Sequence, residues 1–296
     1  MLHRHFIARR HAWMGILMCL LVASILVACG ASPSTGPSST PTSTSAAAIP
    51  KITINATEFS FAMPDTLQAG LVDITLMNQG GLPHLAQLSR LNNGVTQAQV
   101  LAAFSKGPKV LLPLLTFTGG ANVVVPGQSQ EVILNLTQGQ YVMLCFVTGS
   151  DNIPHFVKGM YKFFTVSGQS NANQVSQPQA DGQVTLKNFS FVLPTSIHAG
   201  SMMLQVTNHG SQPHEMDLLL LMLSKSRQDV LAFLQKPAGP PPFADAGGMG
   251  ALAPGMSGWV KLNLTSGNYV ALCFVPDPTT GKLHFALGMI TTFSVQ

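Results

Sequence analysis

The stretch Gly139-Gln140-Tyr141-Val142-Met143-Leu144-Cys145 returns later in the chain as Gly267-Asn268-Tyr269-Val270-Ala271-Leu272-Cys273. In both copies a glycine turn signal precedes an apolar, strand-like run that ends on a cysteine. The stretch Asn78 to His84 is likewise repeated as Asn208 to His214, with Asn, Gly, Pro and His at the same spacing. The repetition predicts two copies of one structural unit.

Each copy carries the same four residues of metal-ligand type. The sets are His84, Cys145, His155 and Met160 in the first copy, and His214, Cys273, His284 and Met289 in the second. Two imidazoles, a thiolate and a thioether are the ligands of a blue-copper site. Three of the nine histidines lie in the first eleven residues, so four of the remaining six belong to these sets. The other two, His198 and His209, lack a histidine counterpart in the first copy and are expected on the surface.

Other roles for these residues stay open at this point. In an exported protein, Cys145 and Cys273 suit a disulfide, but equivalent positions in separate units are expected to lie too far apart. Each cysteine also suits a small buried apolar side chain. Met160 and Met289 also suit core packing. For Glu215, which follows the second-copy histidine, an ion pair or an exposed charge is expected.

The repeats predict two domains, 51–166 and 182–296, joined by a polar linker at 167–181. Alternating apolar residues, as in Ile52 to Asn55, predict strands, and the frequent turn signals favour an antiparallel sandwich. Each domain also contains one predicted helix. These helices span Thr96 to Lys106 and Ser226 to Lys236, and each begins with a capping-box pattern. The Pro/Gly-rich stretch Pro237 to Gly250 is interpreted as a loop, to which the sequence assigns no role.

The first 28 residues form a predicted signal peptide, with three arginines followed by an uncharged apolar run. The sequence Leu26-Val27-Ala28-Cys29-Gly30 resembles a bacterial lipobox, which implies that Cys29 is lipidated. An uncleaved signal anchor is the alternative. Residues 29–50 are rich in Ser, Thr, Pro and Ala and are predicted to be a flexible tether. Both readings place the remaining chain outside the cytoplasm, attached to the bacterial cell membrane.

The charge balance argues against a nucleic-acid partner. All eleven acidic residues and twelve of the fifteen basic residues follow the signal, which leaves a net charge of 12 − 11 = +1. Nucleic-acid binding needs a basic patch. With 9% charged and 46% apolar residues, the composition is typical of a compact secreted protein with a large core.

The repeated motifs resemble the cupredoxin superfamily, which contains plastocyanin-like and azurin-like blue copper proteins. In that family an Asn-x-Gly-x-x-Pro-His turn presents the first ligand, a Gly-x-Tyr-x-x-x-Cys strand presents the thiolate, and a following loop presents a histidine and a methionine. The resemblance covers essentially residues 51–296. It implies an all-β protein of two tandem Greek-key β-sandwiches, each with one short inserted helix and one copper ion.

Two details refine what the resemblance implies. The loop from Cys145 to His155, like that from Cys273 to His284, is longer than in small blue copper proteins. Lengthening a loop costs little entropy, about 0.6 kcal/mol per doubling, so the site is not excluded. The apolar residues near the ligands are expected to form a dry shell and a docking patch; these are Phe146, Phe156, Phe274, Phe285, Leu82 and Leu283.

The family also includes multicopper oxidases and nitrite reductases, which need additional histidines, such as His-x-His pairs or a histidine beside the copper-binding cysteine. Phenylalanine follows both cysteines here, and no His-x-His occurs after residue 5. The sequence therefore predicts that the protein is not an enzyme. It favours a membrane-tethered electron carrier with an unidentified redox partner protein. Copper storage or delivery, or a metal-free binding module of the same fold, are the alternatives.

Overall fold

The structure is a computed structural model that describes residues 47–296. The predicted signal peptide, Cys29 and most of the tether at 29–50 lie outside these residues. Within the described part, no helix is both long and apolar enough to span a membrane.

The two repeats supply matching series of strands. The first repeat contains β1 (Lys51–Thr57), β2 (Ser60–Ala62), β3 (Thr66–Gln68), β4 (Gly70–Asn78), β5 (His84–Leu91), β6 (Leu115–Val124), β7 (Ser129–Leu136), β8 (Gly139–Leu144) and β9 (Tyr161–Ser167). The second contains β10 (Gly182–Lys187), β11 (Ser190–Val192), β12 (Gly200–Asn208), β13 (His214–Leu221), β14 (Phe243–Leu252), β15 (Ser257–Leu264), β16 (Gly267–Leu272) and β17 (Ile290–Val295). The all-β prediction is therefore confirmed.

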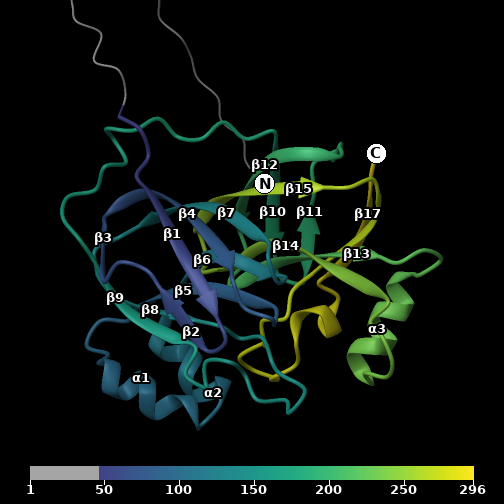
Figure 1. The fold of residues 1–296 in the computed structure, drawn as a ribbon, viewed down its shortest axis with the longest axis horizontal. Helices are drawn as coiled ribbons and strands as arrows, with labels where there is room; N and C mark the ends of the chain where they lie inside the picture. Colours follow the sequence, from purple (N-terminus) through teal and green to yellow (C-terminus); the bar gives the residue numbers. More distant parts are fainter. Residues whose placement is uncertain (1–46) are drawn as a thin grey trace, which may run out of the picture. The chain divides into compact units, whose positions relative to one another are not determined.

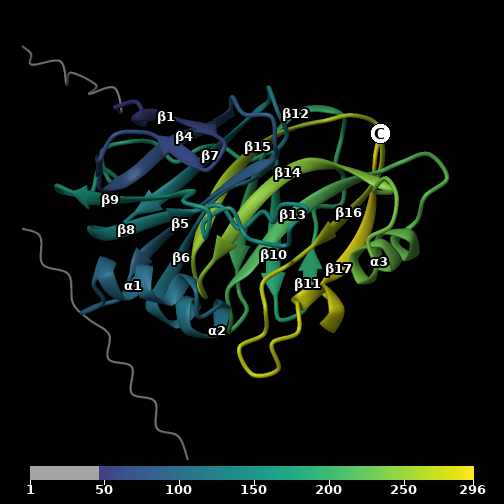
Figure 2. The ribbon, with the colours of Figure 1, turned by 60° about the horizontal axis from the view of Figure 1, so that its bottom comes forward.

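Both sheets run through both repeats. One sheet has the strand order β11-β10-β12-β15-β7-β4-β1-β2, and the other the order β17-β16-β13-β14-β6-β5-β8-β9-β3. The repeats meet at two antiparallel pairs, β7 with β15 and β6 with β14 (Figures 1 and 2). The two sandwiches thus share their backbone hydrogen-bond ladders. The exact domain limits 51–166 and 182–296 stay a prediction.

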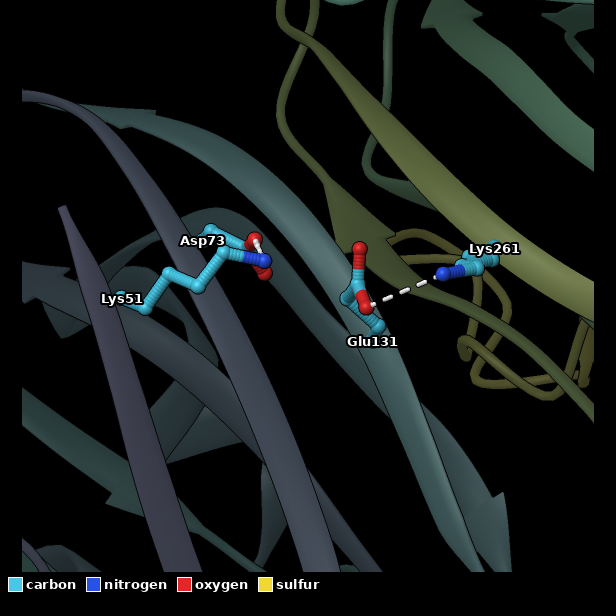
Figure 3. Close-up of polar contacts among 4 residues, drawn as sticks. All are labelled: Lys51, Asp73, Glu131 and Lys261. Carbon is cyan, nitrogen blue, oxygen red and sulfur yellow. Dashed lines mark hydrogen bonds and ion pairs between the residues drawn. The ribbon is translucent and has the colours of Figure 1, made fainter. Parts of the chain in front are cut away.

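Side chains reinforce this junction. Glu131 on β7 and Lys261 on β15 are register partners, and their charged groups lie 3.5 Å apart, whereas Lys51 and Asp73 pair within the first repeat at 2.7 Å (Figure 3). In the other sheet the buried Gln87 amide donates to the Ala251 carbonyl oxygen at 3.0 Å and accepts from the Ala251 N–H at 2.6 Å. Because a buried amide needs such partners, Gln87 stabilises the contact between repeats.

The space between the sheets is filled by apolar side chains of both repeats. The buried set includes Ile54, Leu88, Tyr141, Leu218 and Tyr269, together with both repeat cysteines. Each tyrosine hydroxyl donates to a backbone carbonyl four residues upstream, at 2.9 Å in both copies. The matching bonds fix the start of the strand that leads to each cysteine.

The predicted sandwich is present, but its strand pairing is mixed rather than entirely antiparallel. β1 runs parallel to β4, β10 runs parallel to β12, and β3 runs parallel to β9. Parallel neighbours need a crossover connection. In the first repeat, β2 in one sheet and β3 in the other provide that crossover before β4 returns beside β1.

Helices cover the outer face of the larger sheet. α1 (Gln97–Phe104) and α3 (Arg227–Gln235) confirm the two predicted helices, and both N-termini show the capping boxes. The first repeat adds a short α2 (Pro108–Leu111) and a 3₁₀ turn (Leu112–Leu114) that the sequence did not suggest. α1 and α2 lie toward one end of the molecule and α3 toward the other (Figure 1).

The stretch 237–250 is only partly a loop, because its second half belongs to β14. This glycine-rich strand pairs with β13 through two register shifts, and Gly247 and Gly248 have φ angles of 77° and 141°. A side chain at Gly248 would place Cβ 1.9 Å from the Met216 carbonyl oxygen. Glycine therefore marks a bulged strand here, and the sequence pattern of turns concealed it.

The polar segment 167–181 is held against both repeats. Asn171 accepts from the Leu71 N–H at 2.7 Å and donates to the Leu71 carbonyl oxygen at 3.0 Å. Val175 packs with Leu71 of the first repeat and Trp259 of the second. This linker thus lies on the outer face of the smaller sheet rather than free of it.

Candidate metal centres

A buried asparagine holds the turn that presents the first histidine of each cluster. Asn78 donates to the carbonyl oxygens of Leu82 and Val124 at 2.7 and 2.8 Å and accepts from the Gly80 N–H at 2.9 Å. Asn208 makes the same three bonds in the second repeat, at 2.7, 2.7 and 2.8 Å. The asparagine of the sequence motif therefore fixes the backbone in front of His84 and His214.

The loop after each cysteine returns the second histidine to the cysteine strand. In the first repeat the His155 N–H donates to the Val147 carbonyl oxygen at 2.8 Å, and the Cys145 N–H donates to the Met160 carbonyl oxygen at 3.2 Å. The added loop residues form an excursion closed by a bridge between Thr148 and Pro154. The second repeat has the matching bonds and a bridge between Pro276 and Leu283. The long loop is thus absorbed without displacing the histidine.

In the first repeat three ligand atoms meet in a small triangle. The Cys145 Sγ atom lies 4.0 Å from His84 Nδ1 and 3.6 Å from His155 Nδ1, and the two Nδ1 atoms are 3.2 Å apart. The Leu85 N–H points at the sulfur from 3.5 Å. All three side chains are at most 1% exposed.

The second repeat reproduces the triangle. His214 Nδ1 and His284 Nδ1 are 3.0 Å apart, and Cys273 Sγ lies 3.4 Å from His284 Nδ1. The three ligand atoms of each cluster all lie within 4.8 Å of one another. The Glu215 N–H faces the sulfur at 3.5 Å, as Leu85 does in the first repeat.

These separations fit a metal ion. Bonds of about 2.0 Å to nitrogen and 2.3 Å to sulfur, as zinc makes, put neighbouring ligand atoms roughly 3.3 to 3.7 Å apart. The observed nitrogen–nitrogen and nitrogen–sulfur distances lie close to that range. The donor set combines a soft thiolate with two imidazoles, which suits copper in either oxidation state.

Burial sets the protonation of the clusters without metal. Burial, followed by repulsion from the second histidine of the cluster, lowers the pKa of His84 and of His214 to about 4. Burial raises the pKa of the Cys145 thiol to about 11 and raises that of Cys273 well above its ordinary value. At neutral pH the imidazoles are therefore free to bind a metal, which would displace the thiol proton.

Met160 and Met289 lie beside the clusters but are not placed among the ligand atoms. Both are fully buried and belong to the same apolar cluster as the cysteines. The backbone of each methionine pairs with the cysteine, through the bond from Cys145 N–H to Met160 and its equivalent from Cys273 N–H to Met289 at 3.3 Å. Their role as metal ligands stays a prediction, as does that of the three residues in each triangle.

Only some residues of the predicted apolar shell are buried. Phe156 and Phe285 are buried and pack edge-to-face on Phe146 and Phe274 respectively. Leu82 and Leu283, by contrast, are exposed. The rings that contact the histidines edge-to-face are those of Phe59, at His155, and Phe189, at His214 and His284.

Sequence reasoning missed two amides that contact only the second cluster. Asn188 Oδ1 lies 3.1 Å from His214 Nε2, and Gln212 Oε1 lies 3.0 Å from His284 Nε2. The equivalent positions in the first repeat are Glu58 and Leu82. Alignment of the repeats drew attention to the positions that are identical. The available signal was a position that differs, because the second repeat has the polar Gln212 where the first has Leu82.

The expectation for Glu215 is wrong. Its carboxylate is partly buried and accepts from the Phe274 N–H at 2.7 Å, and it forms no ion pair with any described residue. Burial raises the pKa of Glu215 to about 7. Asp217 on the same face of β13 and Asp245 on β14 also have raised pKa values because of burial. Glu215 and Asp217 thus lie close enough to the second cluster to influence Cys273.

Two further predictions concern the other histidines and a disulfide between the cysteines. His198 and His209 are exposed, as expected. Cys145 and Cys273 are both free and buried, so the disulfide alternative is excluded.

The chain was compared with known proteins. No family model matches the chain, and no curated protein does. Among solved structures, an auracyanin from Roseiflexus castenholzii is 20% identical, over 41% of this chain and 100% of its own, with a TM-score of 0.29. A multicopper oxidase is 14% identical, over 83% of this chain and 88% of its own, with a TM-score of 0.24. A copper-containing nitrite reductase from Thermus scotoductus is 14% identical, over 84% of this chain and 62% of its own, also with a TM-score of 0.24.

One prediction is overturned by these similarities. The sequence was interpreted as excluding an enzyme, but the similar solved structures include a multicopper oxidase and a nitrite reductase. That exclusion is therefore withdrawn.

The fold assignment follows from the chain's own features. Each repeat forms a two-sheet sandwich, and in each an Asn-held turn, a cysteine strand and the loop after it bring two imidazoles and a thiol together. The described part of this chain forms two joined β-sandwiches, as the resemblance to cupredoxins implied, and each contains a His–Cys–His cluster that suits copper.

Proposed function

We propose that this protein carries electrons outside the cytoplasm, tethered to the membrane, with one type 1-like copper in each repeat. The observation that carries the proposal is the duplicated triangle of buried Nδ1 and Sγ atoms. In each triangle the three atoms lie within 4.8 Å of one another. A single cluster of this kind occurs by chance more easily than two at equivalent positions of a repeat.

Copper would supply a one-electron exchange between its two oxidation states, for which thiolate and imidazole are suitable ligands. The chain contributes ligands whose positions are fixed by backbone bonds. Cys145 follows directly on β8, and the N–H groups of His155 and Met160 are both engaged. Because all three cluster side chains are at most 1% exposed, water has little access to the site.

Met160 and Met289 are proposed as weak axial ligands. Both side chains are fully buried next to the cysteine of their own cluster. A thioether is a common weak ligand in such sites. Exchanging either methionine for leucine tests this role, because it would keep the packing and shift the reduction potential.

Tethering and partner binding complete the proposal. The lipobox-like sequence ending at Cys29 supports a lipid anchor in the bacterial cell membrane. Exposed Leu82, Ile153 and Val157 lie near the histidines of the first cluster in sequence and would serve as a docking patch for a redox partner protein.

The test is the visible spectrum and copper content of the full-length protein after addition of Cu(II). An intense blue colour with about two copper ions per chain is expected, because thiolate-to-copper charge transfer produces strong absorption. Cys145→Ser and Cys273→Ser should each remove about half of the colour. His198→Ala, at an exposed histidine away from both clusters, should change nothing.

Voltammetry separates electron transfer from copper storage or delivery. A reversible couple supports electron transfer, whereas tight Cu(I) binding without a couple supports storage. A colourless protein that retains no copper would leave only the metal-free binding module.

A further inference from the structure

The two clusters differ on the outer side of their imidazole rings. In the second repeat both Nε2 atoms meet an amide oxygen, from Asn188 and from Gln212. In the first repeat the Nε2 atoms of His84 and His155 are buried and have no hydrogen-bond partner among residues 47–296.

The orientation of the Asn188 amide is fixed independently of the histidine. Its Oδ1 accepts from the Ser211 N–H at 2.8 Å, and its Nδ2 donates to the Ser211 hydroxyl at 2.7 Å. The amide oxygen therefore faces His214, and since an oxygen only accepts, His214 Nε2 must carry the proton.

The orientation of Gln212 is fixed in the same way. Its Nε2 donates to the Asp277 carboxylate at 2.9 Å, which leaves Oε1 facing His284. A backbone bond from Thr280, followed by the Gln212 bond, lowers the pKa of Asp277 to about 2, so the carboxylate accepts at neutral pH. His284 Nε2 is consequently also protonated.

These bonds leave two unprotonated Nδ1 atoms facing each other at 3.0 Å. Two lone pairs at this separation repel unless a cation lies between them. An acceptor behind a ligand imidazole also fixes its ring and raises its basicity, and losing such a partner costs about 10- to 100-fold in metal affinity. In the second cluster the ring orientations and the unprotonated Nδ1 atoms that a metal needs are thus already set in the metal-free protein.

The first cluster lacks amide acceptors behind its histidine rings. The Glu58 carboxylate, at the position of Asn188, accepts from the N–H groups of Gly81 and Leu82. Leu82, at the position of Gln212, offers no side-chain acceptor. No described contact at Nε2 therefore selects the tautomer of His84 or His155.

We propose that Asn188 and Gln212 are positioning residues that make the second cluster the tighter of the two copper sites. The inference rests on the proposed function, because it requires copper at both clusters. The second site would fill first when copper is scarce.

Competition for Cu(I) against a chromogenic chelator tests the inference in the full-length protein. Cys145→Ala isolates the second site and Cys273→Ala isolates the first. The second site is expected to bind more tightly. In the Cys145→Ala background, Asn188→Ala and Gln212→Leu should each weaken binding by about 10- to 100-fold. Asn188→Asp, which keeps the acceptor oxygen, should restore it.

Glu58→Ala in the Cys273→Ala background is the matched control. It removes the same turn contact in the first repeat, where the carboxylate makes no hydrogen bond to a ligand, so the affinity there should fall by less than about 10-fold. Nitrogen-15 NMR of histidine-labelled, copper-free protein gives a second readout, in which His214 and His284 should show the Nε2–H tautomer and lose it in the variants.

The outcomes separate the two proposals. Equal affinities, a tighter first site, or an unchanged affinity in Gln212→Leu would overturn this inference and leave the proposed function standing. Absence of copper from both sites would overturn the proposed function and this inference with it.

Discussion

Behind the ligand histidines, the second repeat places two oriented amides where the first places a surface carboxylate and a leucine. In front of the histidines the two repeats agree within a few tenths of an ångström in the distance between the Nδ1 atoms, 3.2 and 3.0 Å. Backbone bonds and buried asparagines position the Nδ1 side of the histidines in both repeats. The contacts on the Nε2 side depend on individual side chains that differ between the repeats. The ligand geometry is therefore common to both repeats, and its electrostatic support is specific to one.

A second difference lies on the outer face of the larger sheet. Glu215 and Asp217 of β13 occupy the positions of Leu85 and Gln87 of β5. Gln87 satisfies its amide at the junction with β14, but Asp217 Oδ1 is buried without a partner among the described residues. At this position the second repeat thus carries an energetic cost that the first repeat avoids.

Both repeats use a buried asparagine to hold the histidine turn, so removing it should destabilise the protein strongly and equally in either repeat. Asn78→Ala and Asn208→Ala each leave two carbonyl oxygens and one N–H of the histidine turn without a partner. Each should lower the free energy of unfolding by about 2 to 4 kcal/mol, since a buried unpaired group costs about 1 to 3 kcal/mol. Urea unfolding of copper-free protein measures the loss, with the exposed Asn93→Ala as control. Clearly unequal losses would show that the two turns are not equivalent.

An alanine in the turn should act on one site only. At Gly210 a Cβ would lie 2.6 Å from His214 Nε2 and 2.6 Å from Asn188 Oδ1, whereas at Gly80 its three nearest atoms would all belong to the end of the Glu58 side chain. Gly210→Ala should cost about 1 to 3 kcal/mol through crowding. It should also weaken copper binding at the second site.

Gly80→Ala is the matched control, with a stability change within about 0.5 kcal/mol. Thermal unfolding and Cu(I) competition measure both variants. If the two substitutions weakened their own sites equally, the amide support behind His214 would have no special role.

The smallest predicted effect concerns Asp217. Burial, followed by repulsion from Glu215 and Asp245, raises the pKa of Asp217 well above its ordinary value of 3.8. The unfolded chain ionises above about pH 4 while the folded protein resists ionisation, so stability falls as the pH rises beyond that point. Asp217→Asn should therefore stabilise the protein by about 1 kcal/mol at pH 7 and have little effect at pH 3.

Unfolding at the two pH values measures the effect. Asp65→Asn, at an exposed ion pair with Lys162, serves as the control and should change stability by less than about 1 kcal/mol. A gain that is the same at pH 3 and pH 7 would contradict the ionisation argument.

Much of the fold and of the candidate site was accessible from the sequence. Alternation in 52–55 and the capping boxes at Thr96 and Ser226 are local signals, and they predicted β1, α1 and α3. The stretch 237–250 was misread because its glycines are typical of turns, although they serve a bulged strand. Local signals fail where a residue is selected by a contact with a distant strand.

The residues of the two clusters could be identified from the sequence, because the repeat singles out His84, Cys145, His155 and their counterparts from very few histidines and cysteines. The sharing of both sheets by the repeats, and the difference between the clusters, emerged from the three-dimensional contacts. Sheet register and the contacts of Asn188, Gln212 and Gln87 join residues far apart in the chain. Whether such residues meet depends on the packing of the whole fold, which no local pattern encodes.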